Sequence, residues 1–106
     1  MTLATQRVLR ALLKDPSHEM YGLEICAEAD LPSGTIHPIL ARLERLKWLE
    51  SQWETVDPHH QGRPRRRFYR LTADGAERSR IALARVTETS VAARKRRYVV
   101  TQGGES

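Results

Sequence analysis

The sequence predicts a mainly α-helical domain with a small β-hairpin, arranged as a winged helix-turn-helix and followed by a C-terminal dimerisation helix. Three short segments carry apolar residues at helical spacing, and a pair of strand-like segments follows them. The polar loop between the two strands leads into a cluster of five arginines within residues 63–70. A long helical segment comes after the second strand.

The composition fits one small domain. The chain has 106 residues, of which 40% are hydrophobic and 29% are charged, so it can bury one modest core. A single cysteine, Cys26, excludes an internal disulfide and a multi-thiolate metal site. There is no signal-peptide pattern and no apolar run long enough to span a bilayer. We therefore expect a cytoplasmic protein with no membrane partner.

The first two predicted helices are short. The first covers residues 2–14 and ends at Asp15-Pro16, because the residue before a proline avoids helical geometry. The second covers residues 21–29. Their apolar positions are Leu3, Val8, Leu9, Leu12 and Leu13 in the first helix, and Leu23, Ile25, Cys26 and Ala29 in the second.

The third helix has the clearest pattern. Ser33 is a suitable N-cap, because its hydroxyl can accept a hydrogen bond from a free N–H of the first turn, and the helix is expected to run to about Lys47. Pro38 falls in or just after the first turn, where the missing N–H costs least. The apolar face consists of Ile36, Ile39, Leu40, Leu43 and Leu46.

The remaining segments form a hairpin and a helix. Residues 48–54 alternate apolar and polar side chains as a strand does, residues 55–64 form the loop, and residues 66–71 form the return strand. Thr72 caps the long last helix. The predicted organisation is a DNA-binding winged helix-turn-helix in residues 1–72, a dimerisation helix in residues 73–97 and a flexible tail in residues 98–106.

Charge is distributed unevenly along the chain. Residues 1–62 hold six Lys/Arg and nine Asp/Glu, a balance of −3, whereas residues 63–106 hold twelve and four, a balance of +8. This asymmetry indicates one basic face or projection for a polyanion. In a winged helix-turn-helix, the third helix enters the major groove and the hairpin wing reaches the flanking DNA, so double-stranded DNA is the expected partner.

The third helix and the wing supply the candidate DNA contacts. On a helical wheel, the stripe opposite the apolar face is small and then basic: Gly34, Pro38, Ala41 and Arg45, flanked by His37 and Arg42. Small residues allow close approach to another surface, and Arg or His can reach phosphates or base edges. Together with the residues of the wing tip, the candidate DNA-binding residues are Ser33, Gly34, Thr35, His37, Pro38, Arg42, Arg45, Arg63, Pro64, Arg65 and Arg66.

Two arginines of the cluster have an alternative role. Arg63, Arg65 and Arg66 lie at the turning tip and are expected on phosphate or in the minor groove. Arg67 and Arg70 lie in the return strand, where either can instead pair with Glu50 or Glu54 across the hairpin.

Several blocks together resemble the PadR family of bacterial transcriptional regulators. The resemblance covers about residues 3–85 and rests on six blocks: Tyr21–Ile25, Ser33–Leu40, Leu43-Glu44, Glu50–Glu54, Gly62–Arg66 and Tyr69–Gly75. It implies a winged helix-turn-helix with a C-terminal dimerising helix, and repression relieved by a small-molecule inducer. The Ser33–Leu40 block resembles the start of the recognition helix and the Gly62–Arg66 block resembles the wing. The single C-terminal helix resembles the family's small subgroup.

One position departs from the family pattern. His37 stands where the family commonly has tyrosine. A histidine can also donate to phosphate, more strongly when protonated, which implies a mild dependence of DNA affinity on pH.

Other residues have two possible readings. Adjacent His59-His60 at the loop tip fit a solvated turn better than a metal site, since no cysteine or third histidine lies nearby. Cys26 is expected as a core thiol, with a redox switch as the alternative. Trp48 and Trp53 are expected in the core, with ligand contact as the alternative. The last helix either mediates dimerisation, which we favour, or packs only on its own domain.

The expected function is that of a homodimeric, sequence-specific DNA-binding regulator on a roughly palindromic operator, most simply a repressor. The sequence shows no Gly-rich phosphate loop and no nucleophile with a plausible base, so neither an enzyme nor a cofactor is predicted. Two alternatives stay open: a winged-helix interaction module that binds an acidic partner, and a non-specific nucleic-acid binder.

Overall fold

The structure, a computed structural model, describes residues 1–88 of the chain. Its elements follow in the order α1 (Leu3–Leu13), β1 (Met20–Tyr21), α2 (Gly22–Ala29), α3 (Ser33–Arg45), β2 (Leu49–Trp53), α4 (Pro58–Gln61) and β3 (Arg67–Leu71). Residues 73–88 form a further helix, the C-terminal helix. The predicted helix end at residue 97 and the predicted tail lie outside the described residues.

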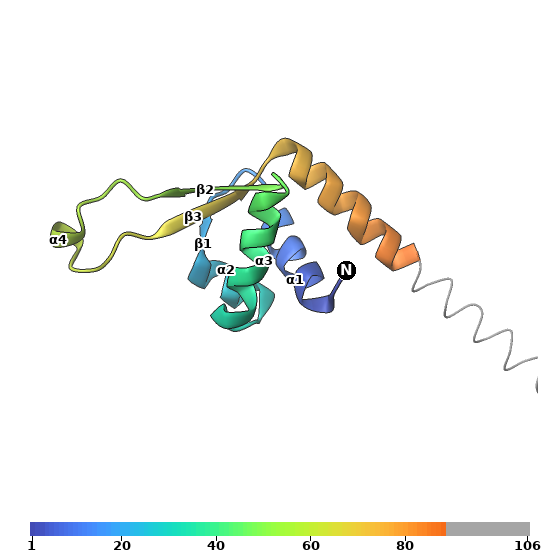
Figure 1. Ribbon diagram of the computed structural model, residues 1–106, viewed down its shortest axis with the longest axis horizontal. Helices are drawn as coiled ribbons and strands as arrows, with labels where there is room; N and C mark the ends of the chain where they lie inside the picture. Colours follow the sequence, from blue (N-terminus) through green and yellow to red (C-terminus); the bar gives the residue numbers. More distant parts are fainter. Residues whose placement is uncertain (89–106) are drawn as a thin grey trace, which may run out of the picture.

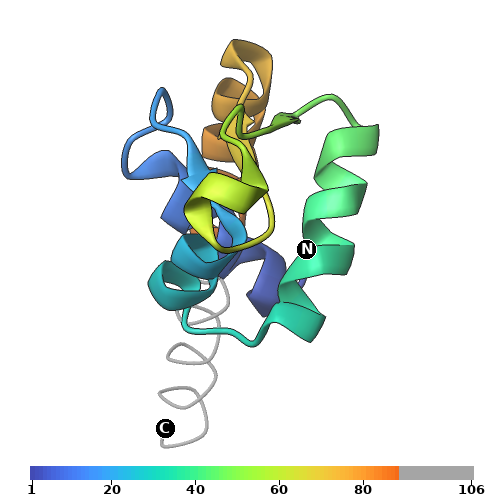
Figure 2. The ribbon, with the colours of Figure 1, turned by 90° about the vertical axis from the view of Figure 1, so that its left-hand side faces the viewer.

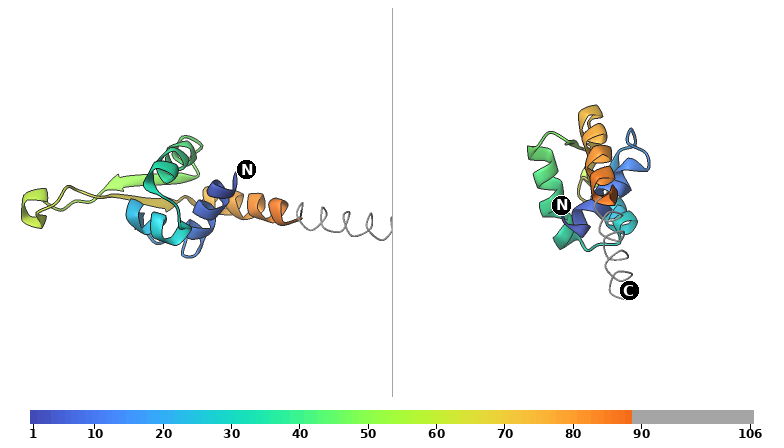
Figure 3. Two further views of the ribbon diagram at one scale, coloured as in Figure 1. Left: turned by 90° about the horizontal axis from the view of Figure 1, so that it is seen from below. Right: turned by 90° about the vertical axis from the view of Figure 1, so that its right-hand side faces the viewer.

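The elements form a compact body with two projections (Figure 1). Helices α1, α2 and α3 pack together beside an antiparallel sheet of strand order β1-β3-β2. The β2–β3 hairpin extends from this body as a wing, and the C-terminal helix leaves on the opposite side (Figures 1 and 3). Viewed along the wing, α4 lies nearest the viewer at the wing tip and α3 lies to one side (Figure 2). This arrangement confirms the predicted winged helix-turn-helix.

The core joins all three helices to the sheet. Its fully buried members come from α1, α2, α3 and β2: Val8, Leu9, Ile25, Ile36, Leu40, Leu43 and Leu49, each at most 2% exposed. Three positions predicted on apolar faces, Leu3, Leu23 and Leu46, are exposed instead. The ends of α1, α2 and α3 extend beyond the region where the helices pack, so terminal apolar residues lie outside the core.

The limits of α3 differ from the prediction at both ends. The N-cap is Pro32, whose carbonyl accepts from the N–H groups of Thr35 and Ile36, so Ser33 is the first helical residue and not the cap. The helix ends at Arg45, because Lys47 adopts a left-handed φ of 65° that turns the chain into β2. A residue other than glycine at such a φ costs about 1 kcal/mol, which the turn must offset.

Two short elements were missed by the sequence analysis. Strand β1 pairs Met20 with Tyr69 and Tyr21 with Phe68, so the sheet has three strands and α2 begins at Gly22. Helix α4 interrupts the predicted loop, where the Asp57 carboxylate accepts from the His59 N–H. Elements of two and four residues are too short to show a periodic pattern.

The start of the C-terminal helix is fixed against the turn between α3 and β2. Thr72 caps it as predicted, because its Oγ1 accepts from the Gly75 N–H and lies 3.0 Å from the Lys47 carbonyl oxygen to which it donates. A Cβ on Gly75 would lie 1.9 Å from the Trp48 carbonyl oxygen, so only glycine fits there. One turn later, fully buried Ser79 donates to the Gly75 carbonyl. These contacts tie the helix to the body.

Candidate nucleic-acid interface

The outward face of α3 is exposed as the sequence predicts. Ile36, Leu40 and Leu43 are buried on one side of the helix. The candidate residues of the other side are exposed, except for half-buried Thr35: Ser33, Gly34, His37, Pro38, Arg42 and Arg45. No heavy atom lies within 4 Å of a Cβ built on Gly34, so the first turn of α3 presents an open surface. The helix therefore presents small side chains first and basic ones later.

Arg42 makes a contact that the sequence analysis missed. Its Nη2 donates to the Thr5 Oγ1 at 3.1 Å, and Thr5 also bonds the α1 cap residue Thr2. Arg42 is thereby drawn toward the start of α1, although it stays exposed to solvent. This contact between α1 and α3 has no local sequence signal, because the two residues are 37 positions apart.

Three of the five wing arginines pair with carboxylates. Arg70 pairs with Glu50 at 2.6 Å across the hairpin, as one of the open alternatives predicted. Arg67 pairs with Glu44 of α3 at 3.5 Å, and not with Glu50 or Glu54. Glu54 pairs with Arg63, which had been expected to be available for phosphate.

Glu54 joins the two sides of the wing just beyond the end of β2. Its side chain is only 11% exposed, and its Oε1 accepts from the Arg63 guanidinium and from the Arg66 backbone N–H. The Arg63 hydrogen bond holds the pKa of the Glu54 carboxyl below its usual value, although desolvation acts in the opposite direction. The same bond raises the pKa of Arg63. A phosphate must compete with Glu54 for Arg63.

The other two candidate arginines make weaker contacts within the protein. Exposed Arg65 donates through Nε to the Val56 carbonyl at 3.1 Å. The Arg66 guanidinium lies 4.4 Å from the centre of the Tyr21 ring, which itself packs edge-on against Phe68. These contacts orient both arginines without a carboxylate partner among the interactions described for residues 1–88. Pro64, between them and Arg63, is exposed.

A pocket joins α3 to the root of the wing. It measures about 210 Å³, and its lining includes Ser33 and His37 of α3 together with Arg66 and Arg67. Half-buried Cys26 also lines it, so this thiol lies at the edge of the core. The structure thus brings candidate residues from two separate parts of the sequence to one surface. Gly34, Arg42 and Arg45 lie on α3 but do not line this pocket.

Trp53 is not a core residue. Its side chain is 57% exposed, because β2 extends past the part of the sheet that α3 covers. Trp48, in contrast, is partly buried and packs against the core as predicted. The Arg67 guanidinium lies 5.1 Å from the centre of the Trp53 ring.

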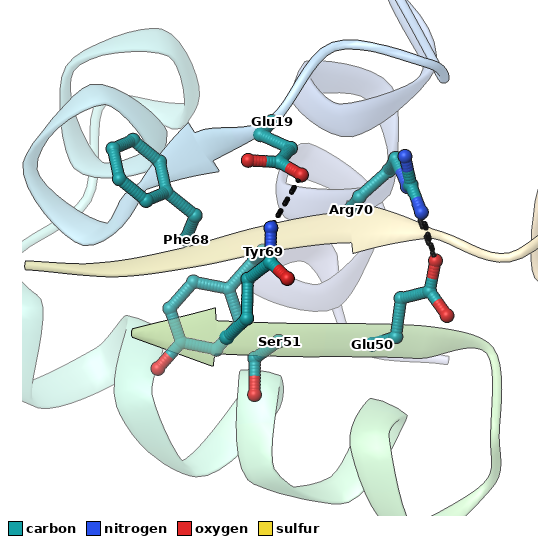
Figure 4. Close-up of a pocket in the computed structure, with 7 residues that line it drawn as sticks. Glu19, Glu50, Ser51, Phe68, Tyr69 and Arg70 are labelled. Atoms are coloured by element: carbon teal, nitrogen blue, oxygen red, sulfur yellow. Dashed lines mark hydrogen bonds and ion pairs between the residues drawn. The ribbon is translucent and has the colours of Figure 1, made fainter. Parts of the chain in front are cut away.

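Other pockets lie elsewhere among the described residues. One of about 160 Å³ opens on the sheet face away from α3, where its charged groups pair within the protein: Arg70 with Glu50, and Glu19 with Gln52 (Figure 4). Another of about 360 Å³ lies between α1 and α2 and includes His18. Neither tryptophan lines these pockets.

Residues 1–88 contain no group of three or more His, Cys, Asp or Glu placed to hold a metal ion. His59 and His60 form part of the exposed α4 turn at the wing tip. None of the helices in the same range has the length and apolar character needed to cross a membrane.

Comparison with known proteins agrees with this geometry. A PadR-family regulator from hypervirulent Clostridium difficile superposes with a TM-score of 0.70 at 21% identity, over 89% of this chain and 97% of that one. A PadR-like transcription factor from Bacteroides fragilis gives a TM-score of 0.66 at 23% identity, over 86% of each chain. BpsR of Bordetella bronchiseptica, whose DNA binding is regulated by 6-hydroxynicotinic acid, gives 0.61 at 20% identity, over 84% of this chain and 64% of that one. No curated protein sequence matches the chain significantly.

The family assignment comes from the sequence itself. The profile of the transcriptional regulator PadR-like family matches residues 8–81, which include the second half of α1, all of α2 and α3, and the wing. Members of this family are DNA-binding regulators and not enzymes, in agreement with the sequence prediction. The chain therefore belongs to the PadR-like family of transcriptional regulators and carries its DNA-binding winged helix.

Proposed function

We propose that this protein is a homodimeric repressor that binds a roughly palindromic DNA site through α3 and the wing. The observation that carries the proposal is the shared pocket between α3 and β3. Ser33 and His37 line it from the helix, and Arg66 and Arg67 line it from the wing strand. A surface that combines a helix with small exposed residues and a basic strand fits a DNA groove and its flanking phosphates.

The two elements have different tasks in this proposal. Small residues at Gly34 and Pro38 allow the start of α3 to approach base edges. Thr35, Arg42 and Arg45 contact base edges or position the helix in the groove. His37 and Ser33 contact phosphate. Arg65 and Arg66 contact phosphate or the minor groove beside it, because neither guanidinium is paired with a carboxylate in the contacts described above. Arg63 contributes only where phosphate displaces Glu54.

Dimerisation is the second part of the proposal. Two winged helices must be spaced by about one helical turn of DNA to read a palindrome. Exposed Ile81 on the C-terminal helix is 46% accessible, and exposed Leu3 lies on α1. Such apolar residues favour contact with a second copy. A small molecule that binds one dimer state better than the other would change the spacing of the two α3 helices and relieve repression. BpsR offers a structural relative whose DNA binding is regulated by a small molecule.

A gel-shift competition tests DNA recognition. Purified protein is titrated against the DNA upstream of its own gene and against random DNA of equal length, at two salt concentrations. The proposal predicts tighter binding to the upstream DNA at both concentrations, with the larger excess at the higher salt, where non-specific binding weakens. Equal affinity for both DNAs would refute sequence-specific binding. A monomer in light scattering at micromolar concentration would refute the dimer.

A further inference from the structure

We propose that Trp53 and Arg67 form an additional DNA contact, in which the indole ring and the neighbouring guanidinium pack together on the sugar-phosphate backbone between α3 and the wing. This inference rests on the proposed DNA-binding function and adds a contact to it. Its occupant is the backbone of double-stranded DNA, independent of base sequence.

The strand register places both side chains on the face of the sheet that α3 covers. Trp53 is the cross-strand partner of Arg67, as Ser51 is of Tyr69. Glu44 of α3 accepts hydrogen bonds from Ser51 and Arg67, so odd-numbered positions of both strands face the recognition helix. Figure 4 shows Ser51 and Tyr69 on this side of the sheet, with Phe68 and Arg70 on the other. Trp53 therefore continues the α3-facing side outward along the wing.

Trp53 is exposed where a large aromatic residue is ordinarily covered. Along this face Leu49 is 2% exposed, Ser51 is half-buried and Trp53 is 57% exposed, so coverage by α3 ends before the last residue of β2. A tryptophan ring left open to water on a surface lined by basic groups is typical of a binding surface. An aromatic face can pack against the deoxyribose of a duplex backbone, a contact that does not depend on base sequence.

Arg67 gives this aromatic surface its positive charge and its orientation. The guanidinium lies 5.1 Å from the Trp53 ring centre, and its Nη2 lies 3.5 Å from the Glu44 Oε1. A guanidinium beside an aromatic ring can still donate through the N–H groups at its edge, which suits phosphate. Arg67 also lines the pocket shared with Ser33 and His37, which connects the pair to the start of α3.

The position of Trp53 and Arg67 between α3 and the wing favours contact with the DNA backbone over contact with a base. When α3 lies in the major groove and the wing tip reaches the neighbouring minor groove, the strand of phosphates between the two grooves passes the region between them. Trp53 and Arg67 occupy that region. Contacts of this kind fix the orientation of the protein on the duplex but carry no sequence information.

Fluorescence offers a direct test, because the chain has two tryptophans in different surroundings. Trp48→Phe removes the partly buried one and leaves Trp53 as the only emitter. Acrylamide quenching of this variant is measured without DNA and with a saturating random-sequence duplex at low salt, while fluorescein anisotropy of the labelled duplex reports binding independently. We expect strong quenching of free protein and at least a twofold loss of quenching in the complex.

The outcomes separate this contact from the function as a whole. If the anisotropy shows bound duplex and Trp53 stays as accessible as before, the proposed contact is wrong and DNA binding stands. If the duplex is not bound at all, the proposed function fails and the contact fails with it. Because the duplex is random in sequence, neither outcome depends on knowing the operator.

Substitutions give a second readout. Trp53→Ala should weaken duplex binding about fivefold or more, with an unchanged dependence on salt, whereas Trp53→Phe should restore most of the affinity. Arg67→Gln should weaken binding and lower the slope of log K against log salt by about 0.9, the value for one phosphate contact. Arg78→Gln is the matched control, because Arg78 also pairs with a carboxylate, Asp74, but lies on the C-terminal helix. Equal effects of Arg67→Gln and Arg78→Gln would overturn the assignment of Arg67.

Discussion

Replacing Gly75 with alanine should destabilise the fold, although alanine is the better helix former. A Cβ at this position would lie 1.9 Å from the Trp48 carbonyl oxygen and 2.5 Å from the Trp48 carbonyl carbon and Cα. Ordinary contacts begin near 3.4 Å, so the C-terminal helix and the α3–β2 turn must separate by roughly 1.5 Å. Both partners are backbone, so no side-chain rotation relieves the overlap.

The magnitude follows from what such a separation breaks. Thr72 donates through its backbone N–H to the Trp48 carbonyl and through Oγ1 to the Lys47 carbonyl, both at 3.0 Å. Losing two such hydrogen bonds costs about 2 kcal/mol, and overpacking adds about 2 kcal/mol. The gain in helix propensity offsets about 1 kcal/mol. The expected net loss in the free energy of unfolding is about 3 kcal/mol, or a fall in Tm of roughly 12–24 °C.

Thermal and urea denaturation at a fixed protein concentration measure this loss. Fixed concentration matters because dimerisation would make Tm depend on it. Gly34→Ala is the matched control, since no heavy atom lies within 4 Å of its added Cβ and the residue lies on a helix. A Gly75→Ala protein within about 0.5 kcal/mol of the parent would refute the argument from close approach.

Three further predictions follow from the interface. Gly34→Ala should raise stability by up to about 1 kcal/mol and yet lower DNA affinity, which is checked by denaturation and anisotropy on one sample; unchanged affinity would mean that the first turn of α3 does not approach DNA. Arg65→Ala with Arg66→Ala should lower the slope of log K against log salt by about 1.8, two phosphate contacts, and an unchanged slope would place the wing tip away from phosphate. The pKa of Glu54 is lowered by Arg63, so its stabilisation is present above pH 4.5 and is lost as pH falls below that value. Glu54→Gln should therefore reduce the loss of stability as the pH falls below 4.5, and an equal loss in the parent and the variant would contradict the pairing.

The periodic spacing of apolar residues predicted the fold well, because it reflects which side chains are buried. The apolar spacing of α3 and the alternation of β2 each reflect one buried face, and both elements appear within two residues of their expected limits. The cap at Pro32 was missed because a carbonyl of an extended proline can begin a helix without any capping side chain. Strand β1 is defined by its partner β3, so its two residues carry no pattern of their own.

The contacts within the candidate site were less predictable. The Arg70–Glu50 pair follows from the strand register, which can be inferred once the two strands are predicted to form a hairpin. The Arg67–Glu44 pair depends on how α3 lies against the sheet, a tertiary arrangement that spacing of 23 residues does not reveal. Exposure of Trp53 likewise depends on where α3 ends its coverage of β2. Alternation correctly placed Trp53 on the inner face but gave no information on how far that face is covered.

The carboxylate pairs of the wing bear on how a regulator finds one site in a genome. Five arginines would attract any stretch of duplex, and non-specific DNA is in vast excess over an operator. Pairing with Glu44, Glu50 and Glu54 leaves two of the five guanidinium groups, those of Arg65 and Arg66, without a carboxylate partner among the described contacts. Part of the positive charge of the wing is therefore neutralised within the protein. In the proposed function, random encounters meet a weakly attractive wing and are short, and only a well-fitted duplex offers phosphates close enough to draw Arg63 and Arg70 from Glu54 and Glu50. Internal neutralisation would in this way shorten the search and sharpen the discrimination between operator and bulk DNA.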